Sequence, residues 1–216
     1  MKIAQNVKQV TDTMARHKTG EATLIAVTKS VDASVARALY DEGIRHFGEN
    51  RPESLLEKVA SMPSDAVFHF IGTLQTRKVR QVIDVVEAIH SLDRLSLAEE
   101  IEKRAKRTID CFVQVNVAEE ESKHGLKKED VVSFIEKCKA YPHVRIVGLM
   151  TMAPLTEDEA IIRQTFAELR TLRDEVVAKS WTHAPCRELS MGMSNDYPIA
   201  LEEGASFVRI GTILVQ

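Results

Sequence analysis

The stretch TLIAVTKSVDASVARALYDEG, residues 23–43, contains the unit from which the chain is built. Its first half holds a short apolar run, residues 24–27, that is typical of a strand buried on both faces. Its second half follows the helix-capping residue Asp32, has apolar residues at helical spacing and stops at Gly43. The stretch therefore predicts one strand followed by one helix.

The same order, strand then helix, recurs along the whole chain. Seven further strands are predicted: IRHFGEN (44–50), VFHFIG (67–72), AIHSLD (88–93), DCFVQVN (110–116), RIVGLMTM (145–152), RELSMGM (187–193) and FVRIGTIL (207–214). Eight alternations in about 200 residues predict an α/β protein with a single (β/α)8 TIM barrel, one domain over residues 1–216. Apolar residues at helical spacing in the first twenty positions predict an extra N-terminal helix. An open doubly wound sheet is the alternative, weakened because no G-x-G-x-x-G follows the first strand.

Composition argues against several classes of function. The chain has 29 basic and 32 acidic residues without a Lys/Arg-rich run, so nothing favours binding to nucleic acid or to an anionic membrane. No apolar segment reaches the length of a transmembrane helix, and the N-terminus lacks the apolar core of a signal peptide. The three cysteines are far apart, without a C-x-x-C pair, which argues against disulfides or a zinc site and predicts a cytoplasmic protein.

Lys29 comes directly after the first predicted strand. Active sites of such barrels lie at the carboxyl ends of the strands, which is where this lysine falls. It is either a surface lysine whose stem lies along apolar residues, or a desolvated amine held for Schiff-base chemistry with a carbonyl compound. The strand alone does not separate these alternatives.

A phosphate site is predicted near the end of the chain. The segment LSMGMSNDYPIALEEG, residues 189–204, passes from a strand through a glycine into a helix opened by Ser194 and Asn195. Backbone N–H groups at such a helix start bind anions, and the loops after strands seven and eight bind phosphate in many barrels. The last strand adds Gly211 and Thr212. Alternatively, Ser194 only caps the helix and Gly211 only permits close packing.

Arg209 lies in the middle of the last predicted strand, on the same face as Phe207 and Gly211. Both faces of a barrel strand are enclosed, so the guanidinium needs an acceptor. That acceptor is either a carboxylate such as Glu49 or an atom of a ligand. A Schiff-base lysine, a phosphate cradle and an arginine together suggest pyridoxal 5′-phosphate (PLP).

These motifs resemble a known family, the YggS/PROSC pyridoxal-phosphate homeostasis proteins, whose barrel is similar to the alanine racemase N-terminal domain, a fold-type III PLP-binding barrel. The resemblance runs in order through AVTKS (26–30), HFGEN (46–50), HFIGTLQTRK (69–78), VQVNVAEEESKHG (113–125), GLMTMAP (148–154) and LSMGMSNDYPIALEEGASFVRIGT (189–212). It implies that PLP is the cofactor and that Lys29 forms the aldimine with it. It places Asn50 near the ring and Arg209 at the pyridine nitrogen. The phosphate would be held by four residues: Met193, Ser194, Gly211 and Thr212.

The chain departs from the family pattern at two places. Arg77 stands where an asparagine is expected, and the chain ends in GTILVQ (211–216), where the family continues with a Phe-Gly pair. The first departure puts any role of that side chain in doubt. The four residues implied in phosphate binding are unaffected.

The resemblance implies a protein that carries or regulates PLP, in vitamin B6 and amino-acid homeostasis, without an established reaction. Arg209 agrees, because an arginine cannot accept a proton and would therefore leave the pyridine nitrogen unprotonated and the ring a weak electron sink. A weak amino-acid racemase-like enzyme is the alternative, but it needs a second base, and Tyr40, Tyr141 and Tyr197 all fall in helices or at their ends. We expect a monomer that passes PLP to apo-enzymes.

A metal-dependent hydrolase is the remaining alternative. His46, His69 and His90 fall in three successive predicted strands. No H-x-H or H-E-x-x-H occurs among them, so we expect histidines that hydrogen-bond to their neighbours and no metal.

Overall fold

The computed structural model describes residues 2–120 and 124–216. Eight parallel strands form a closed barrel in chain order, because β8 pairs with β1 as well as with β7. The strands are β1 (Thr23–Val27), β2 (His46–Glu49), β3 (Val67–Phe70), β4 (Ala88–Leu92), β5 (Ile109–Gln114), β6 (Val144–Met150), β7 (Glu188–Ser190) and β8 (Phe207–Ile210). The predicted (β/α)8 barrel is confirmed, and the open sheet is excluded by the β1–β8 pairing.

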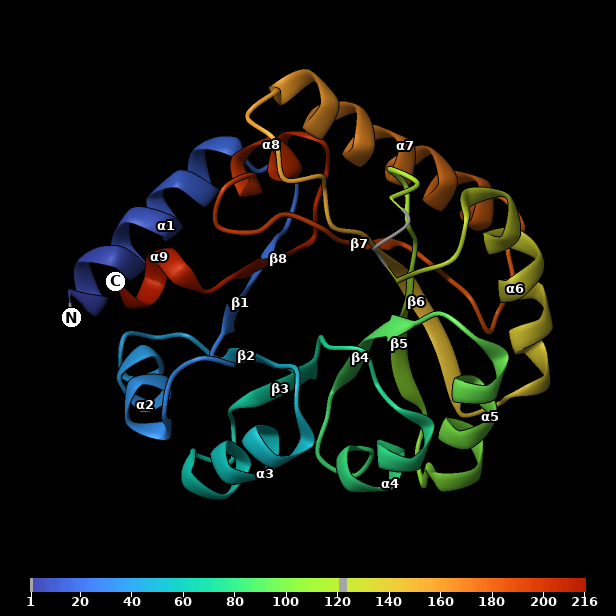
Figure 1. Cartoon of the computed structure of the whole chain (residues 1–216), viewed down its shortest axis with the longest axis horizontal. Coiled ribbons are helices and arrows are strands. Elements are labelled where there is room, and N and C mark those ends of the chain that lie inside the picture. The colour runs from blue at the N-terminus through green and yellow to red at the C-terminus, as the bar shows by residue number, and fades with distance from the viewer. Residues whose placement is uncertain (1, 121–123) are drawn as a thin grey trace.

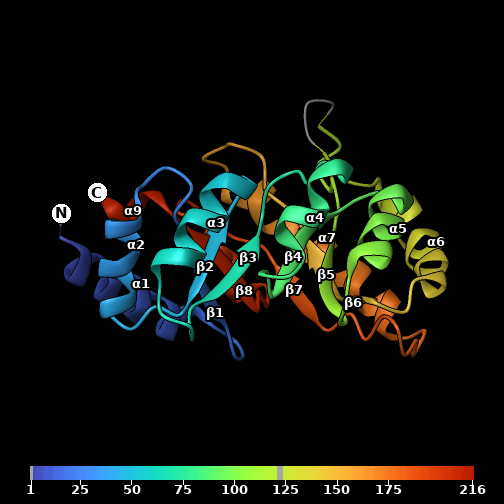
Figure 2. The same ribbon diagram turned by 90° about the horizontal axis from the view of Figure 1, so that it is seen from below.

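Helices surround the strands on the outside (Figure 1), and α2 to α6 follow one another along the wall (Figure 2). The α-helices are α1 (Ile3–His17), α2 (Ala33–Asp41), α3 (Pro52–Ser61), α4 (Val79–Val82), α5 (Leu95–Arg104), α6 (Val131–Lys137), α7 (Glu159–Val177), α8 (Tyr197–Glu202) and α9 (Thr212–Val215). Short 3-10 helices are η1 (Thr76–Lys78), η2 (Lys128–Asp130) and η3 (Cys138–Ala140). Asp32 caps α2 as expected, accepting hydrogen bonds from the backbone N–H groups of Ser34 and Val35.

The predicted extra helix is α1. One stripe of it is buried, Ile3, Val7, Val10 and Met14, and this stripe packs beside α8 and α9. The two ends of the described chain therefore lie side by side (Figure 1). The side-chain amide of Asn6 fastens them, donating to the carbonyl oxygen of Gln216 at 2.8 Å.

The barrel lumen differs from the layer between strands and helices. The outer layer is an extended apolar core, whereas the lumen holds a small apolar cluster around Phe112 and Met150. Beside that cluster lie buried polar side chains: His69, His90, Ser190 and Arg209. Buried polar side chains are costly unless they have hydrogen-bond partners, so this polar group in the lumen marks the candidate functional region.

All three cysteines are free thiols, as the sequence predicted, and all three are buried. Burial raises the pKa of Cys138 and of Cys186 to about 12. Among the residues described, no helix is long and apolar enough to cross a bilayer.

Candidate functional site

The residues expected at the site gather at the carboxyl ends of neighbouring strands. Lys29 lies two residues beyond β1, and Asn50 directly follows β2. At β8 the backbones are close: a Cβ on Gly211 would lie 3.1 Å from the carbonyl oxygen of Val27, on β1. On the other side of β8, toward β7, the backbone N–H of Arg209 donates to the carbonyl oxygen of Gly192 at 2.9 Å. The fold thus brings the ends of β7, β8 and β1 together at one mouth of the barrel.

Lys29 is exposed and lies in a turn. No ion pair or hydrogen bond joins its amine to another described residue, so the amine is accessible. Of the two alternatives left open by the sequence, this position matches the exposed lysine rather than the desolvated amine, because the strand ends at Val27 and the following turn places the lysine at the rim of the mouth. Its covalent role stays a prediction.

A buried ion pair fixes the backbone immediately before Lys29. The amine of Lys58, on α3, donates to a carboxylate oxygen of Glu49 and to the carbonyl oxygen of Thr28, both at 2.7 Å. The side chains of Lys58 and Glu49 are 2% and 0% exposed. The hydroxyl of Thr28 also donates to Glu49. Because Thr28 is held through both its carbonyl and its hydroxyl, the turn that carries Lys29 is anchored to the outer core.

Arg209 does not form the carboxylate pair considered above, since Glu49 faces Lys58 outside the barrel. Its guanidinium donates to the hydroxyl of Ser190 at 2.6 Å and to the carbonyl oxygen of Thr151 at 2.9 Å, both neutral acceptors. Burial lowers the pKa of Arg209 to about 10, which still leaves it charged near neutral pH. Two of its five N–H donors have acceptors among the described residues, so the others are available to a ligand.

The predicted phosphate-binding residue Ser194 does not lie at a helix start, where the sequence had placed it. Helix α8 begins at Tyr197 and has six residues, so Ser194 lies in the preceding turn and does not cap it. The turn is closed by Asp196, whose carboxylate accepts from the backbone N–H of Met193 at 2.6 Å. The hydroxyls of Ser194 and Thr212 bond no other described residue. The cradle therefore offers two hydroxyls rather than a long helix dipole.

Gly192 is required by the shape of this turn. Its φ is +93°, and a Cβ there would lie 2.6 Å from the Cβ of Ala200. Either feature alone disfavours a larger residue, since side chains rarely adopt positive φ. The glycine lets the chain leave β7 and approach the end of β8.

The three histidines on β2, β3 and β4 bond to one another, as predicted. The Nδ1 of His46 lies 2.9 Å from the Nε2 of His69, and the Nδ1 of His69 lies 3.0 Å from the Nε2 of His90. The Nδ1 of His90 lies 2.8 Å from the hydroxyl oxygen of Ser190. Over the described part of the chain, no group of three or more metal-binding side chains occurs.

Asn50 and Arg77 lie near the same mouth with different surroundings. Asn50 is half-buried and packs on Gly72, where a Cβ would lie 2.6 Å from the Asn50 carbonyl oxygen. Arg77, on η1, is exposed, and its Nε donates to the side-chain oxygen of Gln75 at 3.0 Å. Asn50 is therefore placed where it can contact a ligand in the mouth, whereas the Arg77 side chain is hydrogen-bonded to its near neighbour Gln75.

The sequence analysis missed the supporting residues Lys58, Thr151 and Ser190. A signal existed for Lys58, because it lies three residues after Leu55 and four before Met62, on the buried stripe of α3. A lysine on such a stripe needs a carboxylate partner. Ser190 and Thr151 carry no comparable pattern, because their role depends on the contact between β6, β7 and β8.

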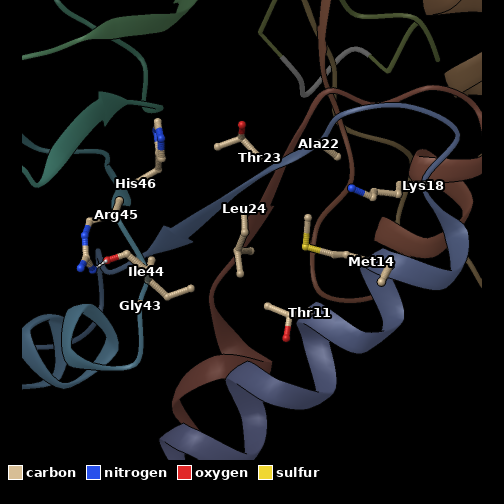
Figure 3. A pocket seen from close by; sticks show the side chains of 11 residues that line it. Thr11, Met14, Lys18, Ala22, Thr23, Leu24, Gly43, Ile44, Arg45 and His46 are labelled. Atoms are coloured by element: carbon tan, nitrogen blue, oxygen red, sulfur yellow. Dashed lines mark hydrogen bonds between the residues drawn. The ribbon is translucent and has the colours of Figure 1, made fainter.

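A hollow of about 350 Å³ lies at the opposite end of the barrel, between α1 and the amino ends of β1 and β2 (Figure 3). Met14, Leu24 and Ile44 give it an apolar lining, and Lys18 and Arg45 lie at its edge. None of the site residues expected from the sequence lines it. It is therefore separate from the carboxyl-end mouth.

The donor set at the carboxyl-end mouth fits PLP. The exposed amine of Lys29 suits an aldehyde, and the hydroxyls of Ser194 and Thr212 suit a phosphate. The spare N–H donors of Arg209 suit a neutral ring nitrogen, which accepts one hydrogen bond. One carboxylate lies in the same turn as Ser194: Asp196 accepts from the backbone N–H of Met193 at 2.6 Å.

Comparison with known proteins gives a consistent result. The profile of the family described as alanine racemase, N-terminal domain, matches residues 1–216. The pyridoxal phosphate homeostasis protein of Aquifex aeolicus is 43% identical over 197 residues, 89% of this chain and 86% of the relative. The human protein of the same name is 34% identical over 205 residues, 88% of this chain and 74% of the relative.

Solved structures agree. The structure of PipY from Synechococcus elongatus with PLP bound has a TM-score of 0.88 and 32% identity, covering 100% of both chains. Alanine racemase from Corynebacterium glutamicum has a TM-score of 0.77 at 14% identity, covering 98% of this chain and 59% of that one, which shows a shared fold alone. The chain belongs to the alanine racemase N-terminal domain family and groups within it with the pyridoxal phosphate homeostasis proteins.

Proposed function

We propose that this protein binds PLP at the carboxyl-end mouth of its barrel and carries or regulates the cofactor in vitamin B6 and amino-acid homeostasis. One observation carries the proposal: Arg209 is a buried cation whose hydrogen-bond acceptors, among the residues that the structure describes, are neutral, and it lies at the same mouth as the accessible amine of Lys29. Its relatives are named for PLP homeostasis, and PipY has been solved with PLP bound.

Each site residue has a distinct role in this proposal. Lys29 supplies the amine that links covalently to the cofactor aldehyde, and Arg209 donates to the ring nitrogen. Asn50 contacts the ring from β2. The phosphate is held by the backbone and side chains of four residues: Met193, Ser194, Gly211 and Thr212. When bound, PLP supplies a conjugated electron sink, and the residue that faces the ring nitrogen determines how strong that sink is.

Arg209 favours a carrier over an enzyme. A guanidinium donates but does not give up its proton near neutral pH, so it leaves the ring nitrogen unprotonated and the sink weak. A racemase also needs a base on each face of its substrate. Tyr40 does not supply the second base, because its hydroxyl bonds Asp65 on the outer surface. A weak racemase-like activity is the alternative.

The proposed function also implies a cellular location, an oligomeric state and partners. We place this single-domain protein, residues 1–216, in the cytoplasm, where its three buried thiols stay reduced. We expect a monomer that delivers PLP to apo-enzymes and has no nucleic-acid partner. The even balance of 29 basic and 32 acidic residues supports the last point.

Two measurements on the PLP-loaded protein separate carrier from enzyme. Deuterium incorporation at the α-carbon of L- and D-alanine, followed by NMR, should not exceed that with free PLP at equal concentration. Mixing with a PLP-dependent apo-enzyme should restore that enzyme's activity. Exchange well above the free-PLP control with either enantiomer would establish the racemase-like alternative instead.

A further inference from the structure

Hydrogen bonds join the lumen histidines and Arg209 into one continuous chain across the barrel. We call His46, His69, His90 and Ser190 the lumen chain. It starts on β2, passes through β3 and β4, crosses to β7 and ends at Arg209 on β8, and its donor–acceptor distances are 2.9, 3.0, 2.8 and 2.6 Å. No carboxylate takes part in it.

The chain has a direction, because one end can only donate. Arg209 has no acceptor atom, so the hydroxyl oxygen of Ser190 accepts its N–H. The single hydroxyl proton of Ser190 then needs an acceptor of its own. Within the described residues, the Nδ1 of His90 is the only other hydrogen-bond partner of that hydroxyl. Ser190 therefore donates to His90.

The direction fixes the tautomer of each histidine. His90 accepts at Nδ1, so it carries its proton on Nε2 and donates to the Nδ1 of His69. His69 likewise donates from Nε2 to the Nδ1 of His46. Burial lowers the pKa of His69 to about 3, and the charge of His46 adds to this. Burial, followed by His69 and Arg209, lowers the pKa of His90 well below its ordinary value.

The chain ends at a cavity of about 330 Å³ at the amino end of the barrel, which His46 and His69 help to line. His46 is half-buried there, and burial lowers its pKa against the opposing effect of Glu87. The charged residues lining the same cavity are Glu87, Asp110, Arg145, Arg187 and Glu188. Asp110 is bound to Arg145 at 2.7 Å. One terminus of the chain thus faces this cavity and the other is the site arginine.

We propose that the lumen chain is a directional series of neutral hydrogen bonds that positions Arg209 and stabilises its buried charge. The inference rests on the proposed function, in which Arg209 faces the ring nitrogen of PLP. Each imidazole presents its lone pair toward the arginine and its N–H away from it, so all the dipoles are aligned favourably with the cation. The chain replaces a carboxylate, whose negative charge would favour a protonated ring nitrogen.

The first test uses the protein without cofactor. Two-bond ¹H–¹⁵N NMR spectra of the histidine side chains report both tautomer and charge. His69 and His90 should be neutral with the proton on Nε2 from about pH 5.5 to about pH 8. The Nδ1–H tautomer at either residue, or an imidazolium at pH 6, would overturn the proposal.

The second test uses matched serine variants. Ser190→Ala removes the link to Arg209, whereas Ser91→Ala removes a buried hydroxyl on β4 that has no hydrogen-bond partner among the described residues. Affinity for PLP and for pyridoxal should fall by a similar factor, at least about threefold, in Ser190→Ala only. The ¹⁵N chemical shift of the ring nitrogen of labelled PLP should change in that variant, and Ser190→Thr should restore both.

Equal effects of Ser190→Ala and Ser91→Ala would mean that the chain only supports the fold, and would contradict the proposal. The two tests also separate the inference from the function beneath it. If PLP does not bind the wild-type protein, the proposed function fails, while the tautomers in the cofactor-free protein still decide whether the chain is directional. If Ser190→Ala does not fold, the tautomer measurement decides alone.

Discussion

Two buried cations lie near the carboxyl ends of the strands, and they are treated in opposite ways. Lys58, outside the barrel, meets the carboxylate of Glu49 and both side chains are almost fully buried. Arg209, inside the lumen, donates to a hydroxyl and a carbonyl oxygen among the described residues, and the charge of Asp196 only partly offsets the effect of burial, which lowers its pKa to about 10. A buried cation with its own carboxylate serves the fold. One with only neutral partners keeps part of its bonding capacity for a ligand, which is why we assign function to the lumen.

The largest expected effect is on the outer pair. Lys58→Met leaves Glu49 as an uncompensated buried carboxylate and should lower the free energy of unfolding by about 3–5 kcal/mol. Urea denaturation measures this. The control is the double variant Glu49→Gln/Lys58→Met, which removes both charges and should recover most of the loss. A loss below about 1 kcal/mol in the single variant would contradict the structural role of the pair.

Arg209→Met is the matching change in the lumen. It removes a cation whose hydrogen-bond acceptors among the described residues are neutral, and Asp196 keeps its bond from the backbone N–H of Met193, so the change should cost less than about 2 kcal/mol of stability. PLP affinity should nevertheless fall. A stability loss as large as that of Lys58→Met would contradict the claim that Arg209 serves ligand binding while Lys58 serves the fold.

The lumen histidines predict an acid sensitivity with a definite sign. The pKa of His69 is about 3 in the folded protein, below its ordinary value of 6.5, so the unfolded chain binds a proton first as the pH falls. The free energy of unfolding should therefore be level above about pH 6.5 and should decrease below it, by up to about 1.4 kcal/mol per pH unit for each such histidine. Denaturation between pH 6.5 and pH 5 separates this from carboxylate protonation.

Two variants test that assignment. His69→Gln should reduce the slope by roughly a third to a half, because His90 and His46, whose pKa values burial also lowers, still contribute. His124→Gln, at an exposed histidine, should leave the slope unchanged. An unchanged slope in His69→Gln would show that the lumen is more accessible to protons than its burial indicates.

The smallest effect concerns the phosphate cradle. The double variant Ser194→Ala/Thr212→Ala removes two hydroxyl donors to a charged acceptor, so PLP affinity should fall at least about tenfold. Pyridoxal, which lacks the phosphate, should bind nearly as before. Titration followed by absorbance measures both ligands. Equal losses for PLP and pyridoxal would assign these hydroxyls to the fold.

The barrel could be predicted from the sequence because each strand and helix has its own local sequence pattern. Alternating apolar runs and caps such as Asp32 depend on neighbours in the chain. Strand order alone places Lys29 and Arg209 toward the carboxyl ends of their strands, and the structure has both there. The sequence left open whether Lys29 is exposed or desolvated, because the answer depends on where β1 ends and the turn begins.

The partners of the site residues were the least predictable feature. Ser190 contacts Arg209 across 19 positions and His90 across 100, and no local pattern encodes such a contact. The expected helix start at Ser194 failed for a similar reason, because Asp196 closes the turn first. The chemical type of each site residue could be predicted from the sequence. Their hydrogen-bond partners could not, because those contacts exist only once the barrel has closed.

The central claim is that the accessible amine of Lys29 is the point of covalent attachment. The protein is incubated with PLP, reduced with borohydride and digested, and the peptides are mapped by mass spectrometry. Lys78, whose amine is bound to Glu53, is the internal comparison. The account predicts a reduced adduct on Lys29 alone and no absorbance of bound PLP in Lys29→Ala. An adduct on Lys78, with Lys29 unmodified, would contradict it.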